Sequence, residues 1–135
     1  MIVLDNDVAV KLLREDDESV KSHLSQYSGE AWAIPSLVCF EFFQHYSRME
    51  VVAQTKQKLL DVFDETLPFT AEVAVEAWRI NNLLESQGIS LDALDLLNLA
   101  TSQEAGATFV THNKRDFDKS PIHSLVDVDV VYTSE

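Results

Sequence analysis

Residues 95–117 read DLLNLATSQEAGATFVTHNKRDF, and this stretch decides the fold. Its first part continues an apolar helical pattern over residues 91–104, and Gly106 suits the left-handed turn that ends a helix. Residues 108–111 (TFVT) form a short, β-branched and apolar run, which predicts a buried strand. Helix, glycine and strand in this order suggest a chain in which helices and strands alternate.

The rest of the sequence alternates in the same way. Further strands are predicted at residues 1–4, 31–35, 67–69 and 126–132. Helices are predicted at residues 9–14, 18–27, 36–49, 51–63, 70–86 and 91–104, with Thr70 as a cap and Gly88 as a stop. This alternation predicts an α/β domain with a central, mainly parallel sheet flanked by helices, in which ligands bind beyond the carboxyl ends of the strands. Because no linker or repeat interrupts the 135 residues, we expect a single domain over residues 1–135.

Composition limits the class of protein. The chain has one cysteine, Cys39, among apolar residues, so no internal disulfide is expected and a reducing compartment is indicated. No apolar stretch is long enough to span a membrane, and the first residues do not resemble a secretory leader, which predicts a cytoplasmic protein. The net charge of −13 argues against a protein that binds a polyanion by bulk electrostatics.

Four carboxylates occupy positions where burial is expected to exclude charge. Asp5 ends the apolar run MIVL, Glu41 lies within VCFEFF, Asp95 lies within ALDLLNLA, and Asp116 follows the strand at residues 108–111. A carboxylate that is buried without a partner costs several kcal/mol or becomes protonated, so such acids usually pair with a cation, cap a helix or bind a metal. Taken singly, each acid has a structural explanation, such as a helix cap for Asp5 or a turn for Asp116.

As a set, the four acids indicate a metal site. Two follow strand ends and two lie in helices that are expected to cover the same crevice. Converging carboxylate oxygens suit a hard divalent ion, Mg²⁺ or Mn²⁺. Such an ion activates water and neutralises charge on a phosphodiester, so the pattern predicts a metal-dependent nuclease that needs no nucleophilic side chain.

Three segments of the chain resemble the PIN-domain family, and within it the VapC-like ribonuclease toxins of toxin–antitoxin pairs. The segments are IVLDNDV, IPSLVCFEFF and the stretch at residues 95–117, and they contain Asp5, Glu41, Asp95 and Asp116. The resemblance implies a three-layer α/β fold, Mg²⁺- or Mn²⁺-dependent cleavage of an RNA substrate, frequent homodimers, and neutralisation by a small antitoxin protein.

The same resemblance assigns supporting roles. It implies that Thr111 and Asn113 orient the loop after the strand and the fourth acid, and that Asp7 contacts the metal or its water. Two positions depart from the family pattern: Asn6 stands where the family usually has Thr or Ser, and Asn98 stands where an apolar residue is typical. Asn98 lies one turn after Asp95, so it either reaches the site or faces water.

Two other functions are considered. The run Asp5-Asn6-Asp7-Val8 after an apolar strand also matches a haloacid-dehalogenase-like phosphatase, in which Asp5 would attack phosphorus and Asp7 would serve the leaving group. Beryllofluoride would trap that enzyme and not a PIN nuclease. The third interpretation keeps the PIN fold as a non-catalytic binding module, which would bind metal without cutting RNA.

Overall fold

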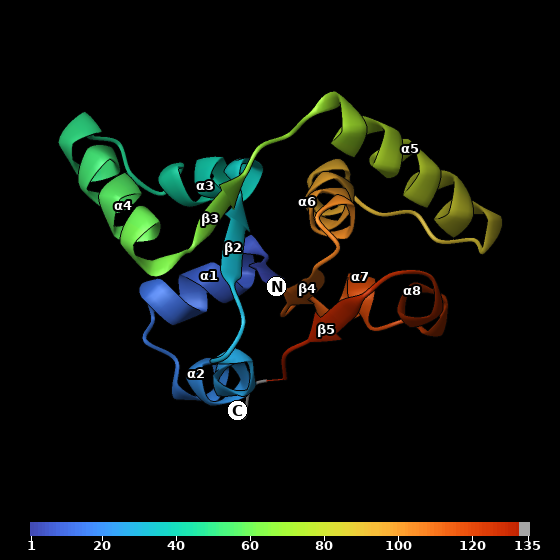
Figure 1. Ribbon diagram of the computed structural model, residues 1–135, viewed down its shortest axis with the longest axis horizontal. Coiled ribbons are helices and arrows are strands. Elements are labelled where there is room, and N and C mark those ends of the chain that lie inside the picture. Colours follow the sequence, from blue (N-terminus) through green and yellow to red (C-terminus); the bar gives the residue numbers. More distant parts are fainter. Residues whose placement is uncertain (133–135) are drawn as a thin grey trace.

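The computed structural model describes residues 1–132, which form an α/β fold around a five-stranded sheet (Figure 1). All four strand pairs are parallel, and the strand order is β3-β2-β1-β4-β5. The strands are β1 (Ile2–Leu4), β2 (Trp32–Pro35), β3 (Glu65–Leu67), β4 (Thr108–Thr111) and β5 (Val128–Val130). The predicted α/β class with a central parallel sheet is confirmed.

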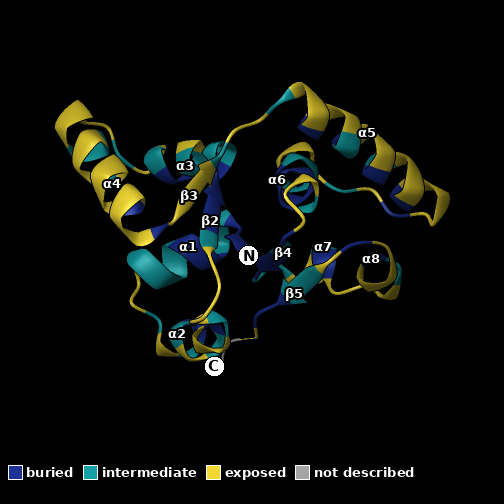
Figure 2. Ribbon diagram, in the orientation of Figure 1, coloured by how far each residue is buried: buried dark blue, intermediate teal, exposed yellow. Residues whose placement is uncertain are grey.

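The sheet separates two apolar cores, because successive side chains of a strand point to opposite faces. In β1, Ile2 and Leu4 belong to one core and Val3 belongs to the other. The first core is covered by α1 (Asn6–Leu13), α2 (Glu18–Leu24), α3 (Ser36–Phe43) and α4 (Met49–Val62). The second is covered by α5 (Ala71–Ser86), α6 (Ala93–Glu104), α7 (Lys114–Phe117) and α8 (Ser120–Leu125). Figure 2 shows the buried central strands between the two groups of helices, whose outer faces are exposed.

The longest helix illustrates how the sequence specifies these elements. Four apolar residues of α5 are buried at helical spacing: Val73, Ala77, Ile80 and Leu84. Thr70 caps α5, since its hydroxyl oxygen accepts a hydrogen bond from the backbone N–H of Val73 at 3.2 Å. Gly88 and Gly106 follow α5 and α6 with φ of 74° and 68°, a conformation that favours glycine. The predicted cap and both stops are confirmed.

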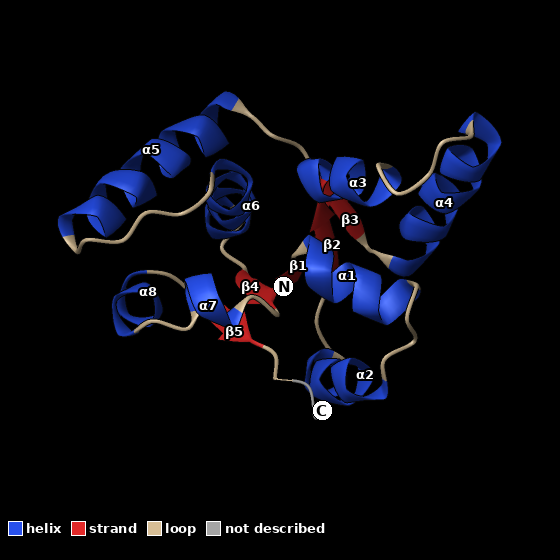
Figure 3. Cartoon of the chain, turned by 180° about the vertical axis from the view of Figure 1, so that it is seen from behind, coloured by secondary structure: helices blue, strands red, loops and turns tan. Residues whose placement is uncertain are grey.

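The strand order creates a topological switch point at the centre of the sheet. The chain runs outward from β1 through β2 to β3, and then returns by α5 and α6 to place β4 on the other side of β1. Ligands of open parallel sheets bind where the order reverses, beyond the carboxyl ends of the strands. That position lies at the ends of β1 and β4, and α1, α3, α6 and α7 surround the central strands in Figure 3.

Several predicted boundaries were wrong. The helix predicted over residues 36–49 ends at Phe43, and α4 begins at Met49. Arg14 explains this break, because its guanidinium donates a hydrogen bond to the carbonyl oxygen of Phe42 and another, at 3.1 Å, to the hydroxyl of Tyr46. A side chain from α1 thus satisfies the end of α3, which spacing along one helix does not reveal.

Other differences concern short elements. The strand predicted at residues 67–69 lies at Glu65–Leu67, where it pairs with β2, and the last strand covers only Val128–Val130 of the predicted 126–132. The helix predicted at 18–27 ends as a 3₁₀ turn, and the helices predicted from residues 9 and 91 begin at Asn6 and Ala93. The sequence analysis missed α7 and α8. No helix within residues 1–132 is long and apolar enough to cross a membrane.

Candidate active site

The first acid lies at the switch point of the sheet. Asp5 directly follows β1 and is only 5% exposed. Its Oδ2 accepts a hydrogen bond from the hydroxyl of Thr111, the last residue of β4, at 2.8 Å. Its Oδ1 accepts a second bond, from the backbone N–H of Asn6 at 2.8 Å, so Asp5 also caps α1. Both oxygens of this buried carboxylate are therefore held in place.

The loop after β4 holds two more carboxylates. Asp7, in the first turn of α1, accepts a hydrogen bond from the backbone N–H of His112 at 3.2 Å. Asp116 on α7 accepts one from the side-chain amide of Asn113 at 2.9 Å, and the Asn113 Oδ1 accepts one from the backbone N–H of Asp116 at 3.2 Å. Asn113 also donates its backbone N–H to the hydroxyl oxygen of Thr111 at 3.2 Å. Hydrogen bonds thus run from Asp116 to the hydroxyl that binds the first acid.

The remaining acids come from α3 and α6. Glu41 on α3 is partly buried, and its Oε1 accepts a hydrogen bond from the Asn98 Nδ2 on α6 at 2.8 Å. Asp95 lies in the first turn of α6, one turn before Asn98. No described residue donates a hydrogen bond to its carboxylate. The acids therefore come from elements on both faces of the sheet.

Burial and the charges of neighbouring carboxylates raise the pKa values of Asp5, Glu41 and Asp95. Burial, followed by the charge of Asp7, holds the pKa of Asp5 well above its ordinary value, although the Thr111 hydrogen bond lowers it. Burial is also the largest cause for Asp95, whose pKa rises to about 6. Neighbouring carboxylates add to that rise: Asp92, Asp116, Glu41 and Asp7. The structure thus places the four predicted acids and Asp7 within electrostatic range of one another.

Only neutral groups hold these acids. Their hydrogen-bond donors are a hydroxyl, two side-chain amides and backbone N–H groups. Among residues 1–132, no salt bridge joins a lysine or arginine to Asp5, Asp7, Glu41, Asp95 or Asp116. The network therefore orients the carboxylates without neutralising them, and among these described acids only Asp7 gains from nearby positive charge, that of His112 and Lys11. A partly buried group of carboxylates is unfavourable unless a cation binds there.

The donor set fits a hard divalent cation in its chemistry. All five side chains offer carboxylate oxygens, which Mg²⁺ and Mn²⁺ prefer. In residues 1–132, however, no group of three or more His, Cys, Asp or Glu side chains has the geometry to hold a metal ion as it stands. Binding one ion therefore requires side-chain rotations, for which Asp95 is the freest because no hydrogen bond holds it.

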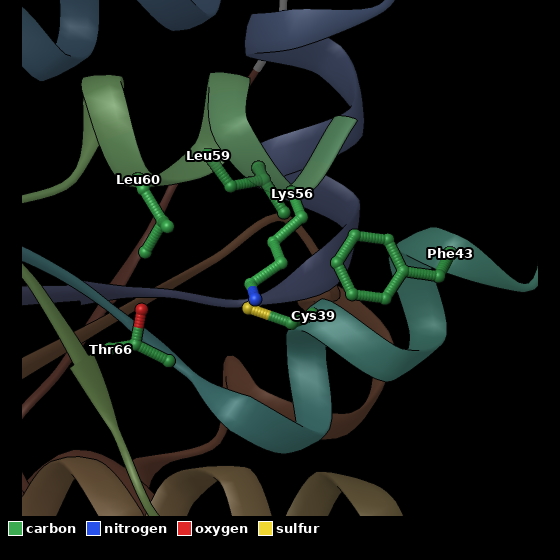
Figure 4. Close-up of a pocket in the computed structure, with 6 residues that line it drawn as sticks. All are labelled: Cys39, Phe43, Lys56, Leu59, Leu60 and Thr66. Carbon is green, nitrogen blue, oxygen red and sulfur yellow. The ribbon is translucent and has the colours of Figure 1, made fainter. Parts of the chain in front are cut away.

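An apolar cavity elsewhere does not belong to this site. It has a volume of about 220 Å³ and is lined by Cys39, Phe43, Lys56, Leu59, Leu60 and Thr66. Figure 4 shows that these side chains come from α3, α4 and β3. Because its lining contains no carboxylate, this cavity is separate from the site that the five acids form.

The contact between Asn98 and Glu41 was not predicted from the sequence. Asn98 was expected either to reach the site or to face water; it is 1% exposed and binds Glu41, which the sequence did not identify as its partner. Its position within DLLNLA was a signal, because a polar residue on a buried helix face needs a partner. The partner lies 57 residues earlier in the chain, so spacing could not identify it.

Fold and site together define an α/β protein with a cluster of carboxylates at the switch point of a parallel sheet. Residues 2–121 match the sequence profile of the PIN domain, so the chain belongs to the PIN domain family. Members of this family are in general nucleases. No curated protein sequence matches the chain.

Several solved structures share this fold, and one of them is a toxin–antitoxin complex. VapBC2 from Rickettsia felis, bound to promoter DNA, matches with a TM-score of 0.75 at 21% identity, covering 96% of this chain and 98% of that one. FitAcB from Neisseria gonorrhoeae gives 0.75 at 23% identity, with coverage of 95% and 96%. A toxin–antitoxin complex from Klebsiella pneumoniae gives 0.77 at 18% identity, with coverage of 99% and 100%. At these identities the similarity shows the fold.

Proposed function

We propose that this chain is a divalent-metal-dependent endoribonuclease that hydrolyses RNA phosphodiester bonds. The observation that carries the proposal is the cluster of carboxylates at the switch point, held only by neutral donors. Asp5, Glu41, Asp95 and Asp116 would hold Mg²⁺ or Mn²⁺, with Asp7 in support. When bound, the ion supplies a Lewis acid that activates water and neutralises charge on the phosphate.

The chain's own residues have separable tasks in this proposal. Hydrogen bonds from Thr111 and from the start of α1 fix the Asp5 carboxylate at the carboxyl ends of β1 and β4. Asp95 is free to turn toward the ion. Asn113 ties Asp116 to the loop after β4, which keeps the fourth carboxylate at the crevice.

The RNA must approach an acidic protein. Lys114 and Arg115 are exposed on α7, next to Asp116 in the sequence. We assign to them the contacts to RNA phosphates that offset the net charge of −13 near the site.

A cleavage assay tests the proposal. Purified wild type and the variants Asp5→Ala and Asp95→Asn are incubated with a mixed RNA pool, with Mg²⁺, with Mn²⁺ and with EDTA, at low and at molar salt. The expected result is metal-dependent cutting by wild type alone, with all proteins folded by circular dichroism. Equal behaviour of wild type and variants would refute the site.

Two further measurements, beryllofluoride binding and Mn²⁺ binding, separate the other two functions. A phosphatase would need Asp5 as nucleophile, yet both oxygens of this buried residue accept hydrogen bonds. Tight beryllofluoride binding would nevertheless establish that function. A binding module would take up Mn²⁺ without cutting RNA at any salt concentration.

We further propose that the chain is the cytoplasmic toxin of a pair and binds a small antitoxin. The support is the fold shared with VapBC and FitAB proteins and with a toxin–antitoxin complex from Klebsiella pneumoniae. A homodimer is also proposed, because Val75 and Trp78 on the outer face of α5 are 66% and 69% exposed. Sedimentation of wild type and Trp78→Glu tests the dimer: wild type is expected to be dimeric and the variant monomeric.

A further inference from the structure

Asn98 is a buried polar residue at the boundary between the two helices that carry Glu41 and Asp95. Its side chain is 1% exposed, and its neighbours in the sequence are Leu97 and Leu99. The Nδ2 donates to the Glu41 Oε1 at 2.8 Å, whereas the Oδ1 is buried with no hydrogen-bond partner among the described residues. An unpaired buried acceptor costs about 1–3 kcal/mol. Packing alone would therefore favour an apolar residue here.

The amide of Asn98 can orient the Glu41 carboxylate, which an apolar residue at this position cannot do. An amide N–H orients a carboxylate without neutralising it, whereas a lysine or arginine would compete with a metal ion for its charge. The bond engages one oxygen of Glu41 and leaves the other, Oε2, without a described donor. Glu41 lies on an eight-residue helix, and the Asn98 contact reaches it from the opposite group of helices.

We propose that Asn98 is a positioning residue that acts through Glu41: it holds one carboxylate oxygen and presents the other to the divalent ion. The inference rests on the proposed function. Asn98 would thus orient Glu41 by a neutral hydrogen bond, as the Thr111 bond to Asp5 and the Asn113 bond to Asp116 orient those acids. Losing such an outer partner typically costs about tenfold to a hundredfold in metal affinity or activity.

The central variant is Asn98→Leu, which keeps the shape of the side chain and removes both polar atoms. Mn²⁺ binding is measured by electron paramagnetic resonance of the free ion, and RNA cleavage is measured in parallel. We expect a Kd for Mn²⁺ that is about ten to a hundred times higher, a lower kcat and an unchanged KM for RNA. Ser102→Ala is the matched control: it removes a buried hydrogen bond from the same helix and is expected to bind Mn²⁺ as wild type does.

A double-mutant cycle tests the route through Glu41. In a Glu41→Gln background, Asn98→Leu is expected to cause no further loss of Mn²⁺ affinity, because its partner is already altered. Asn98→Asp, which cannot donate when ionised, should weaken binding as Asn98→Leu does. Melting curves in EDTA establish that each variant is folded.

The outcomes separate this inference from the proposed function. Wild-type Mn²⁺ affinity in Asn98→Leu, or an equal loss in both backgrounds, would overturn the role of Asn98 alone. A wild type that neither binds Mn²⁺ nor cuts RNA would overturn both proposals together.

Discussion

Replacing Asp95 by asparagine is expected to make the metal-free protein more stable while it abolishes RNA cleavage. The pKa of Asp95 is raised from 3.8 to about 6 by burial and by neighbouring carboxylates. A folded-state pKa that is raised means that the ionised carboxylate destabilises the fold. This penalty is absent below the unfolded value and grows as the pH rises through about 6.

The size of the effect follows from the shift. One pKa unit corresponds to about 1.4 kcal/mol, so a shift of about two units sets an upper bound of about 3 kcal/mol. Since Asp95 is only partly buried, solvent screening reduces the expected gain to about 1 kcal/mol. For a domain of this size, that gain raises the Tm by about 3–4 °C.

Urea unfolding in EDTA at pH 7.5 and pH 4.5 measures the prediction. Asp95→Asn is expected to be more stable than wild type by about 1 kcal/mol at pH 7.5, with most of the difference gone at pH 4.5. Glu65→Gln, which removes an exposed carboxylate on β3, is the control and should change stability little at either pH. If Asp95→Asn is no more stable than wild type at pH 7.5, burial and the neighbouring carboxylates do not destabilise ionised Asp95.

Three further predictions follow from other contacts. Thr111→Val should destabilise the protein by about 1–3 kcal/mol, because Asp5 loses a buried hydrogen bond, and it should weaken Mn²⁺ binding; an unchanged urea midpoint would contradict this. Lys114→Ala with Arg115→Ala should weaken RNA binding and reduce the slope of log Kd against log salt by about 1.4, while a slope equal to that of wild type would place the RNA elsewhere. Gly106→Ala should lower the free energy of unfolding by about 1–2 kcal/mol, because alanine disfavours a φ of 68°. A Cβ at this position meets nothing within 4 Å, so no steric clash adds to that cost, and a variant as stable as wild type would argue against the conformation.

The sequence was sufficient for the class of fold, because its signals are local. The apolar run before Asp5, the helix stops Gly88 and Gly106, and the strand at residues 108–111 each specify an element from a few neighbouring residues. The alternation of these elements then predicted the parallel sheet. Placing Asp5 at a strand end and Glu41 and Asp95 on apolar helices also needed only local pattern, whereas Asp116 lies on α7, a helix that was not predicted.

What could not be predicted depends on contacts between distant residues. The end of α3 is determined by Arg14, which lies 28 residues before the carbonyl oxygen that it binds. The bond between Asn98 and Glu41 spans 57 residues, and no periodicity in either helix indicates it. The short helices α7 and α8 are four and six residues long, too short for a helical pattern to emerge.

The switch point of the sheet has a consequence for synthesis of the chain. Asp5 and Glu41 are translated before Asp95 and Asp116. The strand β4, whose last residue binds Asp5, pairs with β1 although more than a hundred residues separate them in the sequence. On the proposed function, a growing chain on the ribosome therefore lacks the complete set of acids until Asp116 has been synthesised, and it is expected not to cut RNA before that point.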